Sequence, residues 1–398
     1  MKHLGDITKI NGAEIEAVDV ITGGSPCQDL SIAGKRAGLA GARSGLFMEQ
    51  VRIVKEMRQR DRANGRTGDM VRPRFMVWEN VPGAFSSNKG RDFAAVLEEI
   101  IRIAEPEAPD IEVPEKGWNT WGGYHDEVGG RWSVAWRVHD AQYWGVPQRR
   151  RRISVVADFG GDTAGEILFE RKSVSGYLAE SRAAREGLAG NAESGASSAV
   201  RIRGGCDGGG KGTLVQQDCV MPSQALTEVA SSCKQRDFKD STDLVCAVDC
   251  RNFREGGETN GTLQAKSNGG TSYNLQNTVR LGMIVRRLTP MECERLQGFP
   301  DGWTDIGEWR DSMGKLRKPS DSPRYKALGN SIALPFWDFL AKRISAQYLR
   351  PVTMGSLFDG IGGFPLVFER HNGKGTARWA SEIEEFPIAV TKLRFGED

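Results

Sequence analysis

The sequence predicts an α/β protein in which helices pack around a mostly parallel β-sheet, together with a smaller, loop-rich β-type module. Two observations support this fold class. In the first 160 residues, short β-branched runs alternate with stretches of helical periodicity, which is typical of βα units. The chain also holds 49 glycines, and much of their excess falls between about residues 160 and 280, which indicates a separate module.

Three strands and two helices are expected in the first part of the chain. The strands cover residues 17–22, 74–80 and 152–158, and each ends in polar or turn residues. The helices cover residues 47–60 and 92–104, where apolar side chains recur at helical spacing. Ligands of open α/β sheets bind at the carboxyl ends of strands, so these polar strand ends are candidate functional positions.

The weaker periodicity beyond residue 160 predicts three parts. Residues 1–160 form the N-terminal part of the main domain, residues 161–285 form the loop-rich module, and residues 286–398 return to the main domain. No internal repeat of 20 to 50 residues is visible in the sequence, so a repeat architecture is excluded.

Helix signals resume after the module. Thr289, Pro290 and Glu292 form a capping-box start, and a second amphipathic helix is expected over residues 334–349. The segment SLFDGIGGFPLVFE at residues 356–369 has the pattern of a strand, a glycine turn and a helix start. Such a unit normally opens a doubly wound sheet rather than closing it, so the order of the chain is rotated.

Composition excludes several classes of protein. With 39% hydrophobic and 27% charged residues over 398 positions, the chain is neither disordered nor collagen-like. A formal charge of +2 provides no global basic field, so nucleic acid would have to bind at local patches. The seven cysteines contain no CxxC pair, which argues against a disulfide framework and against a metal site. No membrane span or signal peptide is recognisable, so we expect a cytoplasmic protein.

Two strand ends carry candidate catalytic groups. Cys27 lies in the loop Gly-Gly-Ser-Pro-Cys-Gln after the first strand, where an exposed thiol could act as a nucleophile. A small buried hydrophobic residue is the alternative. Glu79 ends the second strand, where it could donate a proton or simply pair with a neighbouring arginine.

Two further patterns could bind a ligand. In the basic run Gln-Arg-Arg-Arg-Arg-Ile, strand alternation would send Arg150 and Arg152 to one face and into one cleft. A solvated basic surface is the alternative. The glycine turn of residues 358–364 is followed about twenty residues later by Glu382, a distance that suits binding of ribose hydroxyls. A glycine turn by itself is more often a plain tight turn.

Together these motifs resemble the cytosine-C5 DNA methyltransferases. The resemblance covers residues 1–158 and 286–395 and leaves only the middle module without a motif. The motifs that carry it are FDGIGGF, SEIE, GDI, GGSPCQDLS, WENV, QRRRRI, RRLTPMECERLQGFP and ALGNSI. In that family the glycine turn comes first, so the family order is restored when residue 398 is joined to residue 1, and the resemblance implies a circular permutation.

The resemblance implies a catalytic role for each matching residue. Cys27 would add to carbon 6 of cytosine, and Glu79 would hold and protonate ring nitrogen 3. Arg152, with Arg150 beside it, would contact the base carbonyl. The substrate pocket would also contain Gln28, Ser31 and Asn80.

The cofactor implied by the resemblance is S-adenosylmethionine, bound in a Rossmann-like methyltransferase fold. Phe358 would stack on adenine, Glu382 would bind ribose, and Asp6 with Ile7 would contact adenine. Ile383 departs from the aromatic residue that many relatives have at this position. The full set of implied cofactor residues is Asp6, Ile7, Pro26, Asn330, Ser331, Phe358, Asp359, Gly360, Ile361, Gly362, Gly363, Phe364, Glu382 and Ile383.

The implied substrate is double-stranded DNA with the target cytosine flipped out, and the middle module would read the flanking bases. An RNA cytosine methyltransferase and an inactive DNA-binding relic are the rival interpretations. A cognate restriction endonuclease is a compatible partner, in a bacterial or phage setting. We expect a monomer, and a segment-exchanged dimer is the alternative.

Overall fold

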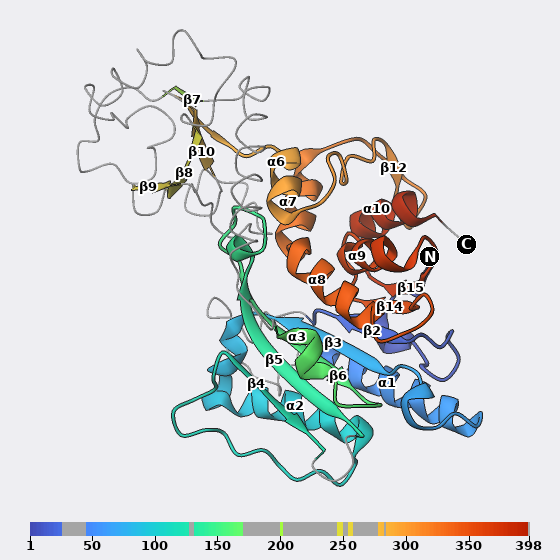
Figure 1. Cartoon of the computed structure of the whole chain (residues 1–398). Coiled ribbons are helices and arrows are strands. Elements are labelled where there is room, and N and C mark those ends of the chain that lie inside the picture. Colours follow the sequence, from blue (N-terminus) through green and yellow to red (C-terminus); the bar gives the residue numbers. More distant parts are fainter. Residues whose placement is uncertain are drawn as a thin grey trace. The chain divides into compact units, whose positions relative to one another are not determined.

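The computed structural model describes residues 1–25, 45–126, 131–169 and 284–396, and four short strands between residues 200 and 281. The chain divides into two compact units (Figure 1). The sheet unit comprises Met1–His139, Arg151–Ser173 and Phe336–Asp398, and the second unit comprises Asp140–Arg150 and Val174–Pro335. The second unit thus includes residues 286–335, which the sequence assigned to the main domain.

The sheet unit is built on eight strands, and its central pairs are parallel. Strands β1 and β15, β15 and β14, β14 and β2, and β2 and β3 pair in parallel, whereas β3 and β6 are antiparallel, as are β4 and β5. In spatial order the strands are β1 (Lys2–His3), β15 (Ala377–Ser381), β14 (Met354–Leu357), β2 (Val20–Gly23), β3 (Phe75–Asn80), β6 (Arg151–Asp158), β5 (Ser133–Asp140) and β4 (Trp121–His125). The mostly parallel α/β fold predicted from the sequence is confirmed, with the three expected strands at β2, β3 and β6.

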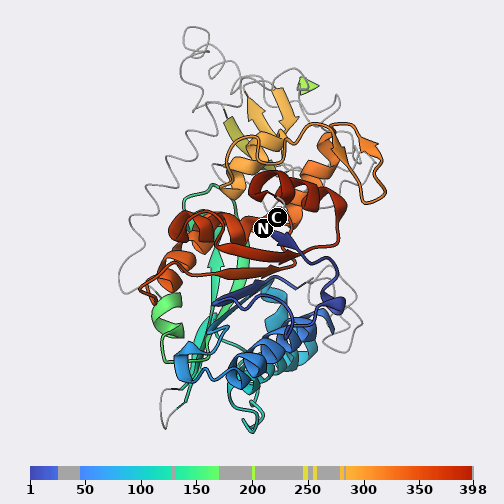
Figure 2. The same cartoon turned by 90° about the vertical axis from the view of Figure 1, so that its right-hand side faces the viewer.

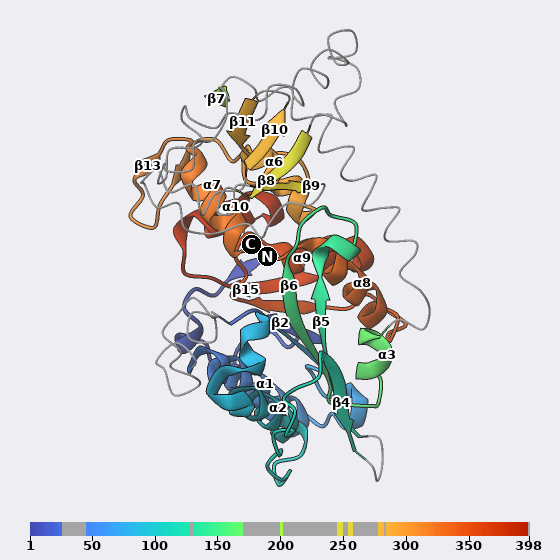
Figure 3. The ribbon, with the colours of Figure 1, turned by 90° about the vertical axis from the view of Figure 1, so that its left-hand side faces the viewer.

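Helices cover both faces of this sheet. In Figure 3, α1 (Gly45–Ala63) and α2 (Arg91–Ala104) lie on the opposite side of the sheet from α8 (Leu334–Ser345) and α9 (Gly363–Asn372). The sheet unit also contains α3 (Ala164–Leu168) and α10 (Glu385–Phe395). Short 3-10 turns occupy Ile7–Lys9, Gly68–Met70, Pro82–Phe85, Ser87–Gly90 and, in the second unit, Ala141–Tyr143.

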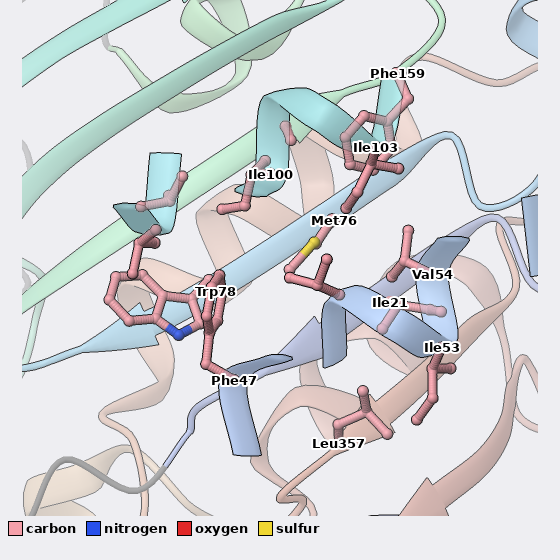
Figure 4. Close-up of a cluster of buried hydrophobic side chains, with 14 of the residues drawn as sticks. Ile21, Phe47, Ile53, Val54, Met76, Trp78, Ile100, Ile103, Phe159 and Leu357 are labelled. Carbon is pink, nitrogen blue, oxygen red and sulfur yellow. The ribbon is translucent and has the colours of Figure 1, made fainter. Parts of the chain in front are cut away.

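The main hydrophobic core lies between the sheet and helices α1 and α2. Trp78 of β3 packs edge-on against Phe47 of α1, with 5.7 Å between ring centroids, and both rings are at most 2% exposed. Figure 4 shows Ile21 of β2 and Leu357 of β14 joining the same cluster, which therefore connects the first and last parts of the chain. Each large apolar side chain buried in this way contributes about 1.5–3 kcal/mol.

The second unit combines helices with a small antiparallel sheet. Helix α6 (Pro290–Gln297) starts with the complete capping box of Thr289 and Glu292 that the sequence predicted. It is followed by the hairpin β12 (Trp309–Arg310) and β13 (Leu316–Arg317) and by α7 (Asp321–Asn330). The small sheet has the order β7 (Val200–Arg201), β11 (Ile284–Arg287), β10 (Thr278–Leu281), β8 (Val245–Asp249) and β9 (Arg254–Gly257).

The two ends of the described chain lie side by side (Figure 2). Strand β1 pairs in parallel with β15, the backbone N–H of Leu4 donates to the carbonyl of Ala380 at 2.8 Å, and the amine of Met1 donates to the carbonyl of Gly396 at 3.3 Å. Among the helices in the described ranges, none combines the length and the apolar character needed to cross a bilayer.

Because residues 1 and 396 are in contact, we predict that a circularly permuted chain, with the same segments joined in a different linear order, still folds. A gene that joins Asp398 to Met1 through a short glycine-serine linker and opens between Tyr348 and the fully exposed Leu349 should give a folded monomer. Circular dichroism would detect the folded state of the permuted chain. Its thermal unfolding midpoint should lie close to that of the protein with the native chain order.

A matched control opens the same circle inside β14, between Gly355 and Ser356. Strand β14 pairs on both sides, with β15 and with β2, so this cut should abolish cooperative unfolding. An unfolded or aggregated product from the Tyr348/Leu349 opening would contradict the prediction.

Candidate functional site

The candidate residues gather at one edge of the sheet because four strands run parallel. Strands β2, β3, β14 and β15 end at Gly23, Asn80, Leu357 and Ser381, and parallel pairing aligns their carboxyl ends. This is the edge at which open α/β sheets bind ligands. The start of the loop that leads to Cys27, the end of β3 with Glu79, the glycine turn and Glu382 therefore all lie at the same edge of the sheet.

An ion pair occupies the β3 end of this edge. Nε of Arg152 lies 2.9 Å from Oε1 of Glu79, with side-chain exposures of 16% and 13% respectively. Glu79 is the register partner of Ser154 on β6, so Arg152 is its diagonal neighbour on the same face. The pair is partly desolvated yet remains open to a ligand.

The loop that leads to Cys27 starts against this carboxylate. A Cβ atom at Gly24 would lie only 2.9 Å from Oε2 of Glu79, so the loop passes close to Glu79 only because residue 24 is glycine. The indole N–H of Trp78 donates to Oγ of Ser25 at 3.0 Å, and the amide of Asn80 donates to the Ser25 carbonyl at 3.4 Å. The first two residues of the loop are therefore fixed to the end of β3.

Four of the predicted residues in this loop, Pro26, Cys27, Gln28 and Ser31, lie outside the described residues. Asn80 is described and is 1% exposed, and its Oδ1 accepts the backbone N–H of Val81 at 2.8 Å. In the described contacts Asn80 holds the strand end and the loop together, and its place in a substrate pocket stays a prediction. Sequence reasoning did not identify Trp78 as a support of the loop, although its position beside Glu79 in the WENV motif was a usable signal.

Arg150 does not share a face with Arg152, which corrects the prediction from strand alternation. Strand β6 begins at Arg151, so alternation does not extend back to residue 150. Arg150 is 2% exposed, and its guanidinium donates to the backbone carbonyls of Gly329, at 3.3 Å, and Ser331. The described contacts of the Arg150 guanidinium are therefore with backbone carbonyls of the second unit.

A glycine turn with left-handed backbone joins β14 to α9. Phe358, Gly360 and Gly362 have φ values of 55°, 58° and 80°. A Cβ at Gly362 would lie 2.5 Å from the ring of Phe395, whereas a Cβ at Gly360 would meet nothing within 4 Å. Position 362 thus requires glycine for packing, and the backbone of Gly360 faces open space that a ligand could occupy.

Glu382 connects this turn to the end of β15. One carboxylate oxygen accepts the N–H of Gly360 at 2.8 Å, and the other accepts those of Ile383 at 2.7 Å and Glu384 at 2.9 Å. These contacts orient the carboxylate toward the turn. Each oxygen has two lone-pair directions, so the contacts leave capacity for a ligand hydroxyl.

Asp359 is buried below the turn with an altered acidity. Burial is the main cause that raises the pKa of Asp359 to about 7, and the negative charge of Glu382 acts in the same direction. The Ser356 hydroxyl lies close enough to oppose this shift but outside hydrogen-bond geometry. A protonated, neutral side chain therefore coexists with the ionised one near neutral pH.

Several buried polar atoms near the turn have no hydrogen-bond partner among the described residues. They are both carboxyl oxygens of Asp359, Oγ of Ser356 and Oγ1 of Thr22, whose residue is the register partner of Ser356. Buried polar atoms without a partner mark places for ordered water or for the polar groups of a ligand. The open space at Gly360 and these atoms fit a small, charged and polar cofactor.

Other predicted cofactor residues have packing or capping contacts, and their place in a cofactor pocket stays a prediction. Ile7 belongs to the main core at 4% exposure, Ile361 is fully buried, and Phe364 packs edge-on against Trp337 with 5.0 Å between centroids. Asp6 caps the following turn by accepting the N–H of Thr8 at 3.0 Å, and these contacts lower the pKa of Asp6.

The remaining predicted cofactor residues belong to the two different units. Ile383 is 71% exposed, and Phe358 packs partly against the main core. Asn330 and Ser331 close α7 in the second unit. Among the described residues, no group of three or more His, Cys, Asp or Glu side chains could hold a metal ion.

A family model described as C-5 cytosine-specific DNA methylase matches residues 1–103 and 197–346. The chain is 31% identical, over 438 aligned positions, to a DNA N-6-adenine-methyltransferase of Escherichia phage P1, with 87% of this chain and 56% of that protein covered. It is 26% identical over 341 positions to the Type II methyltransferase M1.ScrFI of Lactococcus lactis subsp. cremoris, with 85% and 65% covered. The chain thus spans less than two thirds of the length of these two relatives.

Among solved structures, an Entamoeba histolytica methyltransferase, EhMeth, aligns with a TM-score of 0.41 and 12% identity, covering 86% of this chain and 82% of that one. The Type II methyltransferase M.BsuFI of Bacillus subtilis is 32% identical over 155 positions, which cover 39% of this chain and 28% of the relative. The family match covers more than half of the chain and includes the Cys27 loop and strand β3, which carries Glu79. The chain belongs to the family of C-5 cytosine-specific DNA methylases.

Proposed function

We propose that this protein transfers a methyl group from S-adenosylmethionine to carbon 5 of cytosine in double-stranded DNA. The observation that carries the proposal is the Glu79–Arg152 pair, which lies against the start of the Cys27 loop. The glycine turn with its unpartnered polar atoms leaves the same edge of the sheet, so acid, nucleophile loop and cofactor turn are close in the fold. S-adenosylmethionine is the methyl donor of this family.

In the first step the Cys27 thiolate attacks carbon 6 of the base. The new S–C6 bond moves the C5–C6 π electrons toward carbon 5, and Glu79 in its acid form holds ring nitrogen 3 and donates a proton to it. Arg152 lies beside Glu79 and can turn its guanidinium to the base carbonyl oxygen. The two partners of the ion pair thus act on ring nitrogen 3 and on the adjacent carbonyl oxygen of one base.

The bound cofactor supplies an electrophilic methyl group. Carbon 5, made electron-rich by the Cys27 adduct, would accept that methyl group, and the demethylated cofactor would leave. A base from solvent then removes the carbon 5 proton, the C–H electron pair re-forms the C5–C6 double bond, and the S–C6 bond breaks to restore the thiolate. The proton on ring nitrogen 3 returns to Glu79, which is thereby restored to its acid form. Because carbon 6 is not accessible inside a duplex, the cytosine must be flipped out of the stack.

The order of motifs supports a circular permutation of this family's chain. The glycine turn follows the last helix of the family match, outside the matched residues, yet β14 pairs between β15 and β2 at the centre of the sheet. The contact between residues 1 and 396 makes a junction there structurally simple. Residues 161–285 would supply the module that reads flanking bases, as predicted from the sequence.

The name of the phage P1 relative raises adenine as a second target. That name belongs to the whole relative, of which 56% is covered by the match. Methylation of an adenine amino group uses the base nitrogen itself as the nucleophile, so it needs neither a thiol nor an acid at a ring nitrogen. The Glu79–Arg152 pair beside the Cys27 loop therefore favours cytosine.

The Type II names among the relatives support a restriction-modification role, with a cognate endonuclease as partner and the cytoplasm as the location. A solitary or phage-borne enzyme is the alternative.

Digested DNA from cells that express the protein should contain 5-methylcytosine. Mass spectrometry of its nucleosides checks this and separates 5-methylcytosine from N6-methyladenine. The variant Cys27→Ala should lose transfer by more than about 1,000-fold while duplex binding persists, because it removes only the nucleophile. Cys27→Ser, which replaces the thiol by a hydroxyl of similar size, is the matched control variant. Only N6-methyladenine, methylation confined to RNA, or near-native turnover by Cys27→Ala would contradict the proposal.

Glu79→Gln should lower kcat by about 100-fold or more, since the amide cannot donate the proton to ring nitrogen 3. Single-turnover methyl transfer measures this. The control is Glu49→Gln, which breaks another glutamate–arginine pair, with Arg52 at 2.6 Å, on helix α1. Equal losses in both variants would show a general effect on folding and remove Glu79 from its proposed role.

Asp359→Asn should raise stability most at high pH. Because the folded state raises the pKa of Asp359 to about 7 from an ordinary 3.8, ionisation destabilises the fold progressively as pH rises from about 4 to 7. The asparagine variant should gain on the order of 2 kcal/mol relative to wild type between pH 5 and pH 8, measured by denaturant unfolding. Asp69→Asn at an exposed site is the control, and a pH-independent difference would refute the assignment.

A further inference from the structure

Two buried side chains bind the backbone at the end of helix α7. The Gln297 amide donates to the carbonyl of Leu328 at 2.9 Å, and the Arg150 guanidinium donates to the carbonyls of Gly329, at 3.3 Å, and Ser331. Gln297 is fully buried and Arg150 is 2% exposed. The two residues are far apart in the sequence: Gln297 is at the end of α6, and Arg150 is in the stretch before β6.

The chemistry of a helix end explains this arrangement. The last carbonyls of an α-helix lack intrahelical donors and carry partial negative charge. Helix α7 ends at Asn330 with Ser331 as its C-cap, so a guanidinium at this point meets both the free carbonyls and the helix dipole. A buried guanidinium is tolerated only when it is hydrogen-bonded, and here one of its nitrogens, Nη2, donates to both carbonyls.

The segment held in this way, residues 328–331, contains Asn330 and Ser331. These are the residues that the family resemblance assigns to the cofactor pocket. We infer that Arg150 and Gln297 are positioning residues for this segment, and that Arg150 acts on cofactor binding rather than on the target base. This inference rests on the proposed function.

The inference separates two arginines of one motif. Arg152 pairs with Glu79 at the sheet edge, so its loss should affect the chemical step. Arg150 donates to the carbonyls of Gly329 and Ser331, so its loss should affect cofactor affinity. Arg149, which is exposed between the motif's glutamine and Arg150, provides a control in the same stretch of chain.

The test measures binding of S-adenosylhomocysteine to the full-length protein by calorimetry, without DNA. Arg150→Lys keeps the charge but loses the planar fork, and Gln297→Met keeps the volume but loses the donor. Both should raise the Kd about tenfold, whereas Arg149→Lys and Arg152→Lys should leave it near wild type. In steady-state assays, the first two variants should raise KM for S-adenosylmethionine far more than they lower kcat.

Hydrogen–deuterium exchange gives a second, activity-independent measurement. Peptides covering residues 327–333 should exchange faster in Arg150→Lys and Gln297→Met, while peptides covering β3 should keep their protection. Should Arg150→Lys fail to fold, Gln297→Met decides the question from a different helix. Wild-type protein that binds no S-adenosylhomocysteine would count against the proposed function, and exchange at residues 327–333 would still test the contacts.

Two results would overturn the inference. One is an unchanged Kd and unchanged exchange at residues 327–333 in both variants. The other is a fall in kcat with an unchanged Kd in Arg150→Lys, which would return Arg150 to the target base.

Discussion

Parallel pairing of β15, β14, β2 and β3 is the constraint on which the rest of the sheet unit depends. Parallel strands end at a common edge, and here that edge receives a carboxylate, a thiol-bearing loop and a glycine turn from segments far apart in the sequence. Strand β14 enters between β15 and β2, so the last fifty residues complete the sheet that the first eighty residues begin. Any linear order of the chain that preserves these pairings preserves the edge.

Polar contacts reinforce this join between the chain's first and last parts. Arg350 donates two hydrogen bonds of 2.7 Å to Asp19, and the backbone of Thr353 donates a third at 2.9 Å. Burial would raise the pKa of Asp19, but these contacts outweigh it and lower the pKa. The carboxylate therefore stays ionised and ties the start of β14 to the start of β2, at the opposite ends of these strands from the carboxyl-end edge.

The run of four arginines shows how position in the fold divides similar residues between tasks. Arg149 and Arg151 are exposed, Arg150 is buried against a helix end, and Arg152 reaches Glu79. Strand alternation applies only from Arg151 onward, because the backbone before it follows another path and belongs to the second unit. A single basic motif therefore supplies both the partner of Glu79 and the side chain that binds the end of α7.

Local patterns in the sequence were sufficient for the α/β class, the strands β2, β3 and β6, and the capping box of α6, since hydrophobic periodicity and cap chemistry act over a few residues. They were also sufficient to select Glu79, Glu382 and the glycine turn as residues at strand ends. Which side chains meet was decided by long-range pairing: Arg152 with Glu79, Gly24 against that carboxylate, and Arg150 on the carbonyls of α7. Ile7 and Phe364 became core residues for the same reason, because burial depends on what packs above a residue and not on its neighbours in sequence.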